Sequence, residues 1–130
     1  MVIAVSESDV PIQIEFEGEL KLKFILDRVK GPLIIEEIKS LLPIEGKAAY
    51  LRGEMKITLG INKGNLKPTK NVKRGEIAYM PLGDSLCIYL QDMSTFSQVN
   101  VIGRVDSDEK LLDALTDVRR GSQAKITLLE

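Results

Sequence analysis

Two apolar runs joined by a short turn constrain the fold more than any other feature of the sequence. The runs cover residues 77–80 and 86–90, and the turn between them covers residues 81–85. Successive side chains of a strand point to opposite faces, so a strand that is apolar at every position is apolar on both faces. The pattern predicts a β-hairpin near the centre of the molecule that is covered on both sides.

An earlier segment has a different character. Residues 12–16 and 20–24 alternate apolar and polar side chains on either side of Gly18, as half-buried strands do. Phe16 and Leu20 share a face only if an odd number of residues separates them. We therefore expect a three-residue loop or a bulge, with Gly18 at positive φ. Glutamates on the outer face of the first strand oppose lysines on the second, which supports this register.

Further along the chain, the spacing of apolar residues changes twice from the period of a strand to that of a helix. One helix is expected to begin at Pro32 and to end before Pro43, with one face formed by Ile34, Ile35, Ile38, Leu41 and Leu42. The second is expected to follow Asp106 as its cap, with Glu109 three residues later.

The remaining segments predict strands. They are expected near residues 48–51, 55–61, 99–105 and 124–128. The basic stretch 62–74 is expected to be a long loop with at most a short strand. About eight short strands and two short helices indicate a mainly β fold, a closed or nearly closed β-barrel, and 130 residues suit a single domain, 1–130.

Composition matters mainly for what it excludes. The chain has no histidine, no tryptophan and one cysteine, Cys87. A Ser-His-Asp or Cys-His arrangement cannot form, nor can a histidine or thiolate metal site, so neither a metal nor a cofactor is expected. A lone cysteine forms no internal disulfide, which favours a reducing, cytoplasmic location.

Charge and the N-terminal sequence bear on partners. A net charge of −1 gives no overall attraction to nucleic acid or to membranes. The first apolar run covers residues 1–5, which is too short for a signal peptide or a membrane span. We expect a small molecule or a peptide as partner, not nucleic acid or membrane; the oligomeric state stays open.

The central hairpin also carries a family resemblance. GEIAYMPLGDSLCIYL (75–90), followed by VNVIGRV (99–105) and LLDALTDV, resembles the small archaeal and bacterial cyclophilin-like proteins. The matching positions are Gly75, Tyr79, Pro81, Gly83, Leu86, Cys87 and the run Asn100–Arg104. The resemblance covers nearly the whole chain. It implies a cyclophilin-like, eight-stranded barrel closed at its ends by helices.

The chain departs from this family at positions that matter for function. Arg52 stands where the family usually has tryptophan, and Met80 and Leu82 replace a tryptophan and a second proline. True cyclophilins combine an arginine with a pocket that includes a histidine and often a tryptophan. Because this chain has neither, the resemblance implies the fold and argues against isomerase activity.

Five residues are candidates for lining a ligand groove: Arg52, Glu54, Tyr79, Met80 and Gln91. Arg52 is expected to donate to a ligand carbonyl or carboxylate, with Glu54 orienting it. The alternative is an exposed loop pair of little energetic value. Tyr79 and Met80, with Leu82 and Tyr89, offer an adaptable apolar surface with hydroxyl groups. The alternative is ordinary core or a seat for a helix.

Other polar clusters have simpler interpretations. Gln98, Asn100 and Arg104 either join Gln91 at the rim of a site or cap turns. The cations of residues 62–74 are interpreted as a solvated loop, since no aromatic residues lie among them to stack on bases. The carboxylates of residues 106–109 are interpreted as helix-capping groups, not metal ligands. Cys87 is interpreted as an inert, buried thiol.

Three classes of function follow. The preferred one is a binding module for a small ligand or short peptide, with no catalytic residue identified. The first alternative is a peptidyl-prolyl isomerase, which needs no nucleophile, only an arginine that stabilises the rotating bond and an apolar pocket. The second is a partner-binding subunit of a larger enzyme assembly, since the fold also resembles domains of amide-hydrolysing assemblies.

Overall fold

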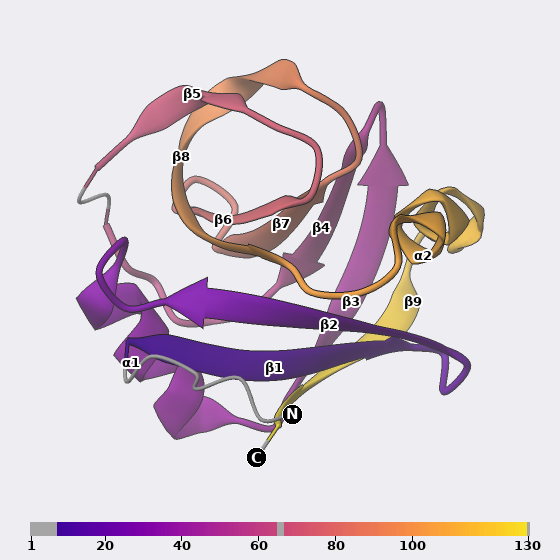
Figure 1. The fold of residues 1–130 in the computed structure, drawn as a ribbon, viewed down its shortest axis with the longest axis horizontal. Helices are drawn as coiled ribbons and strands as arrows, with labels where there is room; N and C mark the ends of the chain where they lie inside the picture. Colours follow the sequence, from indigo (N-terminus) through magenta and orange to yellow (C-terminus); the bar gives the residue numbers. More distant parts are fainter. Residues whose placement is uncertain (1–7, 65–66, 130) are drawn as a thin grey trace, which may run out of the picture.

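A computed structural model describes residues 8–64 and 67–129, and its strands curve into a ring (Figure 1). The N-terminal apolar run of residues 1–5 lies outside the described residues. The elements are, in order, β1 (Asp9–Phe16), β2 (Leu20–Asp27), α1 (Pro32–Leu41), β3 (Ile44–Leu51), β4 (Glu54–Thr58), β5 (Thr69–Val72), β6 (Glu76–Met80), β7 (Ser85–Tyr89), β8 (Met93–Val105), α2 (Glu109–Ala114), the 3-10 helix η1 (Leu115–Asp117) and β9 (Ser122–Leu128).

Eight of these strands close the ring. Their order is β2-β1-β9-β3-β4-β7-β6-β8, and β8 pairs again with β2. The closing contact is tightest at Gly103, which pairs with Leu26. A Cβ at this position would overlap the carbonyl oxygen of Ile25, so only glycine lets the two strands approach. The predicted fold class, mainly β with about eight strands in a closed arrangement and two short helices, is confirmed.

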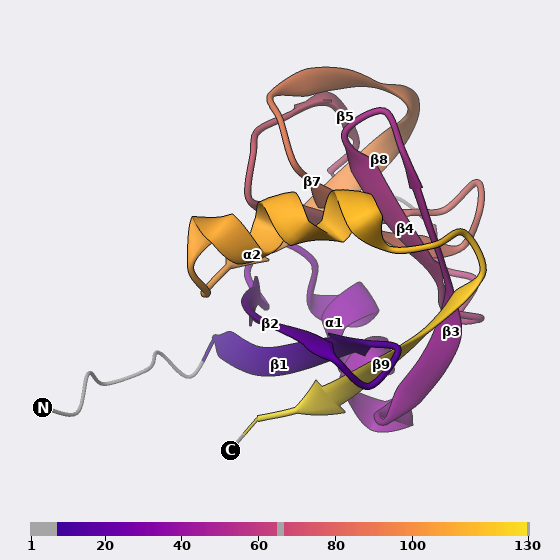
Figure 2. The same cartoon turned by 90° about the vertical axis from the view of Figure 1, so that its right-hand side faces the viewer.

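The main core fills the ring, and the two α-helices lie at opposite ends of it (Figures 1 and 2). α1 buries Ile34, Ile35 and Ile38, and α2 buries Leu112. Leu41 was expected on the buried face of α1 but is 47% exposed, because the helix ends there. No helix in the described part of the chain is long and apolar enough to cross a membrane.

The β1–β2 hairpin matches its prediction. Phe16 pairs with Leu20 across a three-residue loop in which Gly18 has φ 73°. One face of each strand is buried in the main core. On the other face, Glu15 pairs with Lys21 at 3.6 Å between the carboxylate and ammonium groups. The hairpin therefore needs cover on one side only.

The predicted cap of α2 is wrong by two residues. Asp108 caps the helix, its carboxylate accepting from the amide of Lys110 at 2.9 Å. The amide of Asp106 donates instead to the carbonyl of Lys23 (2.7 Å), and Ser107 accepts from the amide of Lys23 (2.6 Å). These contacts with β2 keep the segment extended, so the helix begins later than the local pattern suggests.

The β6–β7 hairpin is covered on both sides, as predicted. Its inner face (Ile77, Tyr79, Leu86 and Ile88) belongs to the main core. Its outer face lies in a second cluster formed by Val72, Ala78, Met80, Cys87, Tyr89 and Val99. The cover is a strand pair, β5 with residues 93–100 of β8, which we call the cover ribbon; it arches over β6 and β7 in Figure 1. The predicted loop at 62–74 contains one short strand, β5; its residues 65 and 66 lie outside the described residues.

Candidate functional site

The cover ribbon bends beside the outer face of the β6–β7 hairpin. Thr69 pairs with Val99, and Asn71 pairs with Ser94, so residues 95–98 leave the ladder. The hydroxyl of Thr95 donates to the carbonyl of Ser97 at 2.7 Å and closes this bend. Phe96 lies within it, with its side chain 96% exposed. A large aromatic side chain is thus held in solvent by local hydrogen bonding.

The facing wall is the β6–β7 turn, which one side chain holds in place. The carboxylate of Asp84 accepts from the amides of Ile61 (3.1 Å) and Asn62 (2.9 Å) and from the hydroxyl of Tyr79 (2.6 Å). These bonds fix the turn to the loop after β4. Leu82 stands on the turn with 73% of its surface exposed.

The same hydrogen bonds shift the acidity of both partners. Burial, together with the bond to Asp84, raises the pKa of Tyr79 to about 12. Burial alone would raise the pKa of Asp84, but the bonds from Tyr79, Asn62 and Ile61 outweigh it and hold this pKa below its ordinary value. The amide of Lys63 also donates to the Tyr79 hydroxyl at 3.0 Å. The hydroxyl of Tyr79 therefore serves the architecture of the turn.

Between the two walls lie two adjoining hollows, which together we call the Leu82–Phe96 groove. Both are lined by Leu82, Phe96 and Ser97. The outer hollow, of about 620 Å³, is completed by Lys70, Pro81 and Gln98. The inner hollow, of about 240 Å³, is completed by Glu54, Lys56, Met80, Gly83 and Ser85. The groove is apolar on its walls and polar on its β4 side.

The polar side comes from the outer face of β4. Glu54 and Lys56 are two positions apart on this strand, and their charged groups lie 3.3 Å from each other. Glu54 is largely sheltered, with 14% of its side chain exposed, whereas 42% of Lys56 is exposed. Across the ladder, Glu54 pairs with Tyr89 and Lys56 pairs with Cys87.

Tyr89 carries an unusual polar group. Its hydroxyl is fully buried and has no hydrogen-bond partner among the described residues. Burial raises its pKa, and the neighbouring Cys87 and Glu54 raise it further, although neither meets the geometry of a hydrogen bond to it. Burial, then the charge of Glu54, raises the pKa of Cys87 to about 12. A buried hydroxyl without a partner in the protein is uncommon.

The structure brings two of the five predicted groove residues into one site. Glu54 and Met80 line the inner hollow. Tyr79, the neighbour of Met80 on β6, faces the main core because adjacent strand residues point to opposite sides. Arg52 lies exposed in the β3–β4 turn with φ 50°. Gln91 packs against the backbone of Gly53, at the same corner, and neither Arg52 nor Gln91 lines the groove.

Sequence reasoning missed the residue that most shapes the groove. Phe96 is a single aromatic among polar neighbours, and no periodic pattern shows that it lies in a bend of β8. Of the predicted rim residues, Gln98 lines the outer hollow. Asn100 is buried and accepts from the amide of Lys67 at 2.8 Å, so it holds the loop before β5. Arg104 is exposed.

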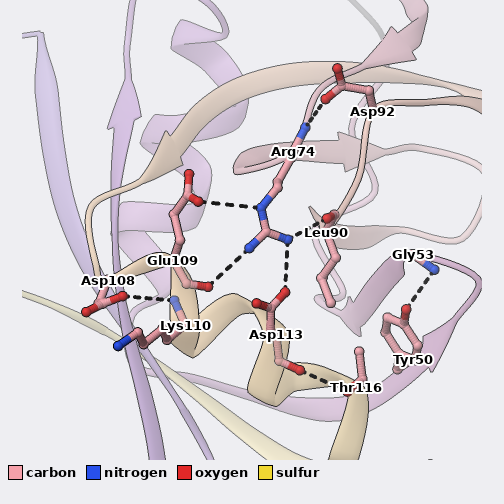
Figure 3. A network of polar contacts seen from close by, with 10 residues as sticks. All are labelled: Tyr50, Gly53, Arg74, Leu90, Asp92, Asp108, Glu109, Lys110, Asp113 and Thr116. Atoms are coloured by element: carbon pink, nitrogen blue, oxygen red, sulfur yellow. Dashed lines mark hydrogen bonds and ion pairs between the residues drawn. The ribbon is translucent and has the colours of Figure 1, made fainter.

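Two cations of the basic segment are already paired. Arg74 donates to the carbonyl of Leu90 (2.7 Å) and pairs with Asp113 of α2 at 3.1 Å, while its amide donates to Asp92 (Figure 3). Lys63 pairs with Glu37 of α1 at 3.3 Å. These contacts fasten the two ends of the segment to the helices.

Two further observations bear on chemistry. In residues 8–64 and 67–129, no three histidine, cysteine, aspartate or glutamate side chains gather closely enough to hold a metal ion. A separate hollow of about 580 Å³ lies between the β1–β2 turn and η1, lined by apolar residues and the charges of Glu17, Glu19, Asp117 and Arg119. No large apolar residue of its lining is strongly exposed, whereas Leu82 and Phe96 are, so the Leu82–Phe96 groove is the stronger candidate.

The chain is similar to known proteins in family and in fold. The model of a family described as cyclophilin-like matches residues 10–127. No curated protein matches the chain. The solution structure of the hypothetical protein AF2241 from Archaeoglobus fulgidus is similar, with 23% identity, a TM-score of 0.77, and coverage of 98% of this chain and 100% of that one. The structure of McbB in complex with tryptophan is also similar in fold, with 12% identity, a TM-score of 0.71, and coverage of 89% of this chain and 44% of that one.

Proposed function

The chain belongs to the cyclophilin-like family, and we propose that it is a binding module that takes an apolar small ligand or short peptide into the Leu82–Phe96 groove. The carrying observation is that Leu82 and Phe96 stand exposed on facing walls above a polar strand face. Large apolar side chains grouped at the surface usually mark an interaction site. Ligand sites commonly combine such walls with a few polar groups.

An aromatic probe is a reasonable first choice. McbB, whose fold is similar, was determined with tryptophan bound, and this chain spans less than half of that protein. At 12% identity the likeness concerns the fold alone. The chemistry of the groove supports the same choice independently, because Met80 and Phe96 contact aromatic rings favourably.

The geometry favours binding over isomerisation. The isomerase alternative depends on Arg52 acting beside an apolar pocket, and Arg52 does not line the groove. The proposal includes a cytoplasmic location, in keeping with a single, buried cysteine. It also includes the absence of nucleic acid binding, since the paired Arg74 and Lys63 leave a smaller free basic surface than the sequence suggests.

The test is a titration followed by amide NMR shifts. Indole and the hexapeptide acetyl-Ala-Ala-Phe-Pro-Ala-Ala-amide are added to ¹⁵N-labelled protein. We expect the largest shifts at the amides of Leu82, Gly83, Phe96 and Ser97. Phe96→Ser should weaken binding at least tenfold, since it removes one wall.

A matched control is available on α1. Leu33 is 65% exposed and lies outside the groove, so Leu33→Ser should leave both affinities unchanged. Failure of both probes to shift the groove amides at millimolar concentration would rule out the proposed function. Equal losses in the two variants would do the same.

A further inference from the structure

We propose that the inner hollow recognises a zwitterion, a free α-amino acid with a large apolar side chain. This deepens the proposed function and rests on it. The juxtaposition that carries it is one carboxylate, one ammonium group and an apolar slot within a single hollow, formed by Glu54, Lys56 and the side chains of Met80, Leu82 and Phe96.

The charged groups of Glu54 and Lys56 are available for contact with a ligand in the inner hollow. Glu54 and Lys56 point from the same face of β4, and each has only the other as a charged partner among the described residues. A partly exposed ion pair of this kind contributes little to stability, because water competes for both groups. A ligand with its own ammonium and carboxylate groups can therefore separate Glu54 from Lys56. The single ion pair is then replaced by two, one between Glu54 and the ligand ammonium and one between Lys56 and the ligand carboxylate.

The size of the inner hollow limits the ligand. Its volume is about 240 Å³, below the range of about 300–1,000 Å³ typical of sites for drug-sized molecules. A single amino acid is of the right scale. With its charged end at Glu54 and Lys56, its side chain would lie between Leu82 and Phe96 and extend toward the outer hollow.

Tyr89 is the neighbour of Glu54 across the β4–β7 ladder. Its hydroxyl is buried, has no hydrogen-bond partner among the described residues and lies close enough to Glu54 for that charge to add to burial in raising its pKa. Buried polar groups are nearly always satisfied, by protein, water or ligand. Tyr89 does not line the hollow, so the charge complementarity of Glu54 and Lys56 carries the proposal.

The experiment uses calorimetry and amide shifts to compare four ligands that share a phenyl group and differ in which charged groups they carry. They are L-phenylalanine, 3-phenylpropanoate, 2-phenylethylamine and N-acetyl-L-phenylalaninamide. We expect L-phenylalanine to bind tightest and each singly charged analogue to bind about tenfold more weakly, because a charged contact is worth about one decade in affinity. The neutral amide should be the weakest.

Charge-removing variants assign each contact. Glu54→Gln should weaken L-phenylalanine and 2-phenylethylamine about tenfold and leave 3-phenylpropanoate no weaker. Lys56→Met should weaken L-phenylalanine and 3-phenylpropanoate and leave the amine no weaker. The control is Glu19→Gln, an exposed carboxylate outside the groove, which should change none of the affinities. Circular dichroism checks that each variant is folded.

The outcomes separate this inference from the proposed function. The zwitterion would be overturned, with the binding module left intact, by equal affinities for all four ligands. It would also be overturned if each variant weakened 2-phenylethylamine and 3-phenylpropanoate to the same extent. Binding of indole or of the hexapeptide alone would have the same consequence. Failure of every probe to shift the groove amides would overturn both.

Discussion

The β1–β2 hairpin has strands of eight residues and the β6–β7 hairpin has strands of five, and the two differ in what their outer faces meet. In β1–β2, the outer face carries charged pairs such as Glu15 with Lys21 and is exposed to solvent. In β6–β7, the outer face is apolar and the cover ribbon packs on it. The groove lies where this second cover stops. A hairpin with one apolar face has that face covered by the main core. A hairpin with two apolar faces needs a second cover, and where that cover stops, apolar side chains remain at the surface.

The sharpest way to break this comparison is to place the same charge on each outer face. Ala78→Glu puts a carboxylate into the second cluster, where Ala78 is fully buried, and should cost about 3–5 kcal/mol or unfold the protein. Gln13→Glu, on the outer face of β1, should change stability by no more than about 0.5 kcal/mol. Urea unfolding measures both. Similar costs would mean that the cover ribbon does not exclude water.

A smaller effect compares the two tyrosines on opposite faces of the β6–β7 hairpin. Tyr79→Phe removes the bond to the carboxylate of Asp84 and the bond from the amide of Lys63. It should cost about 1–3 kcal/mol, because these two groups are partly buried and each loses a partner. Tyr89→Phe removes a hydroxyl that has no partner and should be neutral or slightly stabilising. The measurement is the free energy of unfolding in urea. A loss in Tyr89→Phe as large as that in Tyr79→Phe would show that a bound group satisfies Tyr89.

The smallest expected effect concerns pH. The folded-state pKa of Asp84 lies below its ordinary value of 3.8. Its stabilising contribution is therefore complete above about pH 4 and is lost as pH falls through the lower, folded value. Asp84→Asn should cost about 1 kcal/mol at pH 7, and the difference from the native chain should shrink below pH 4.

The matched control for the pH series is Glu15→Gln on the one-sided hairpin. It removes an exposed carboxylate and should change the melting temperature little at any pH between 7 and 3. Melting curves of the three proteins across this range give the comparison. A pH-independent cost of Asp84→Asn would show that the turn does not depend on the ionised carboxylate.

Sequence patterns predicted the structure best where local periodicity and tertiary contacts agree. The loop at Gly18, the register of Phe16 with Leu20 and the two-sided hairpin all follow from which side chains must avoid water. The cap of α2 was misplaced because contacts between Asp106, Ser107 and Lys23 compete with it, and these partners are more than 80 residues apart in the chain.

For the site, the sequence indicated residue types and the general region. It selected Glu54 and Met80, which line the groove, together with Tyr79, Arg52 and Gln91, which do not. Tyr79 and Met80 could not both face one groove, since neighbours on a strand point apart. The placement of Arg52 and Gln91 depends on the turn between β3 and β4, which periodicity does not describe.

By itself, the sequence determined the hairpins, their buried faces and the cyclophilin-like fold. The alternation of apolar and polar side chains and the continuous apolar runs indicate which strand faces must be buried. Only the tertiary structure decided what covers them. The ring closes at Gly103, the cover ribbon bends at residues 95–98, and Phe96 therefore faces Leu82 across the groove. Such contacts join segments distant in the chain, and their geometry depends on backbone approach and hydrogen bonding, which hydrophobic patterns do not record.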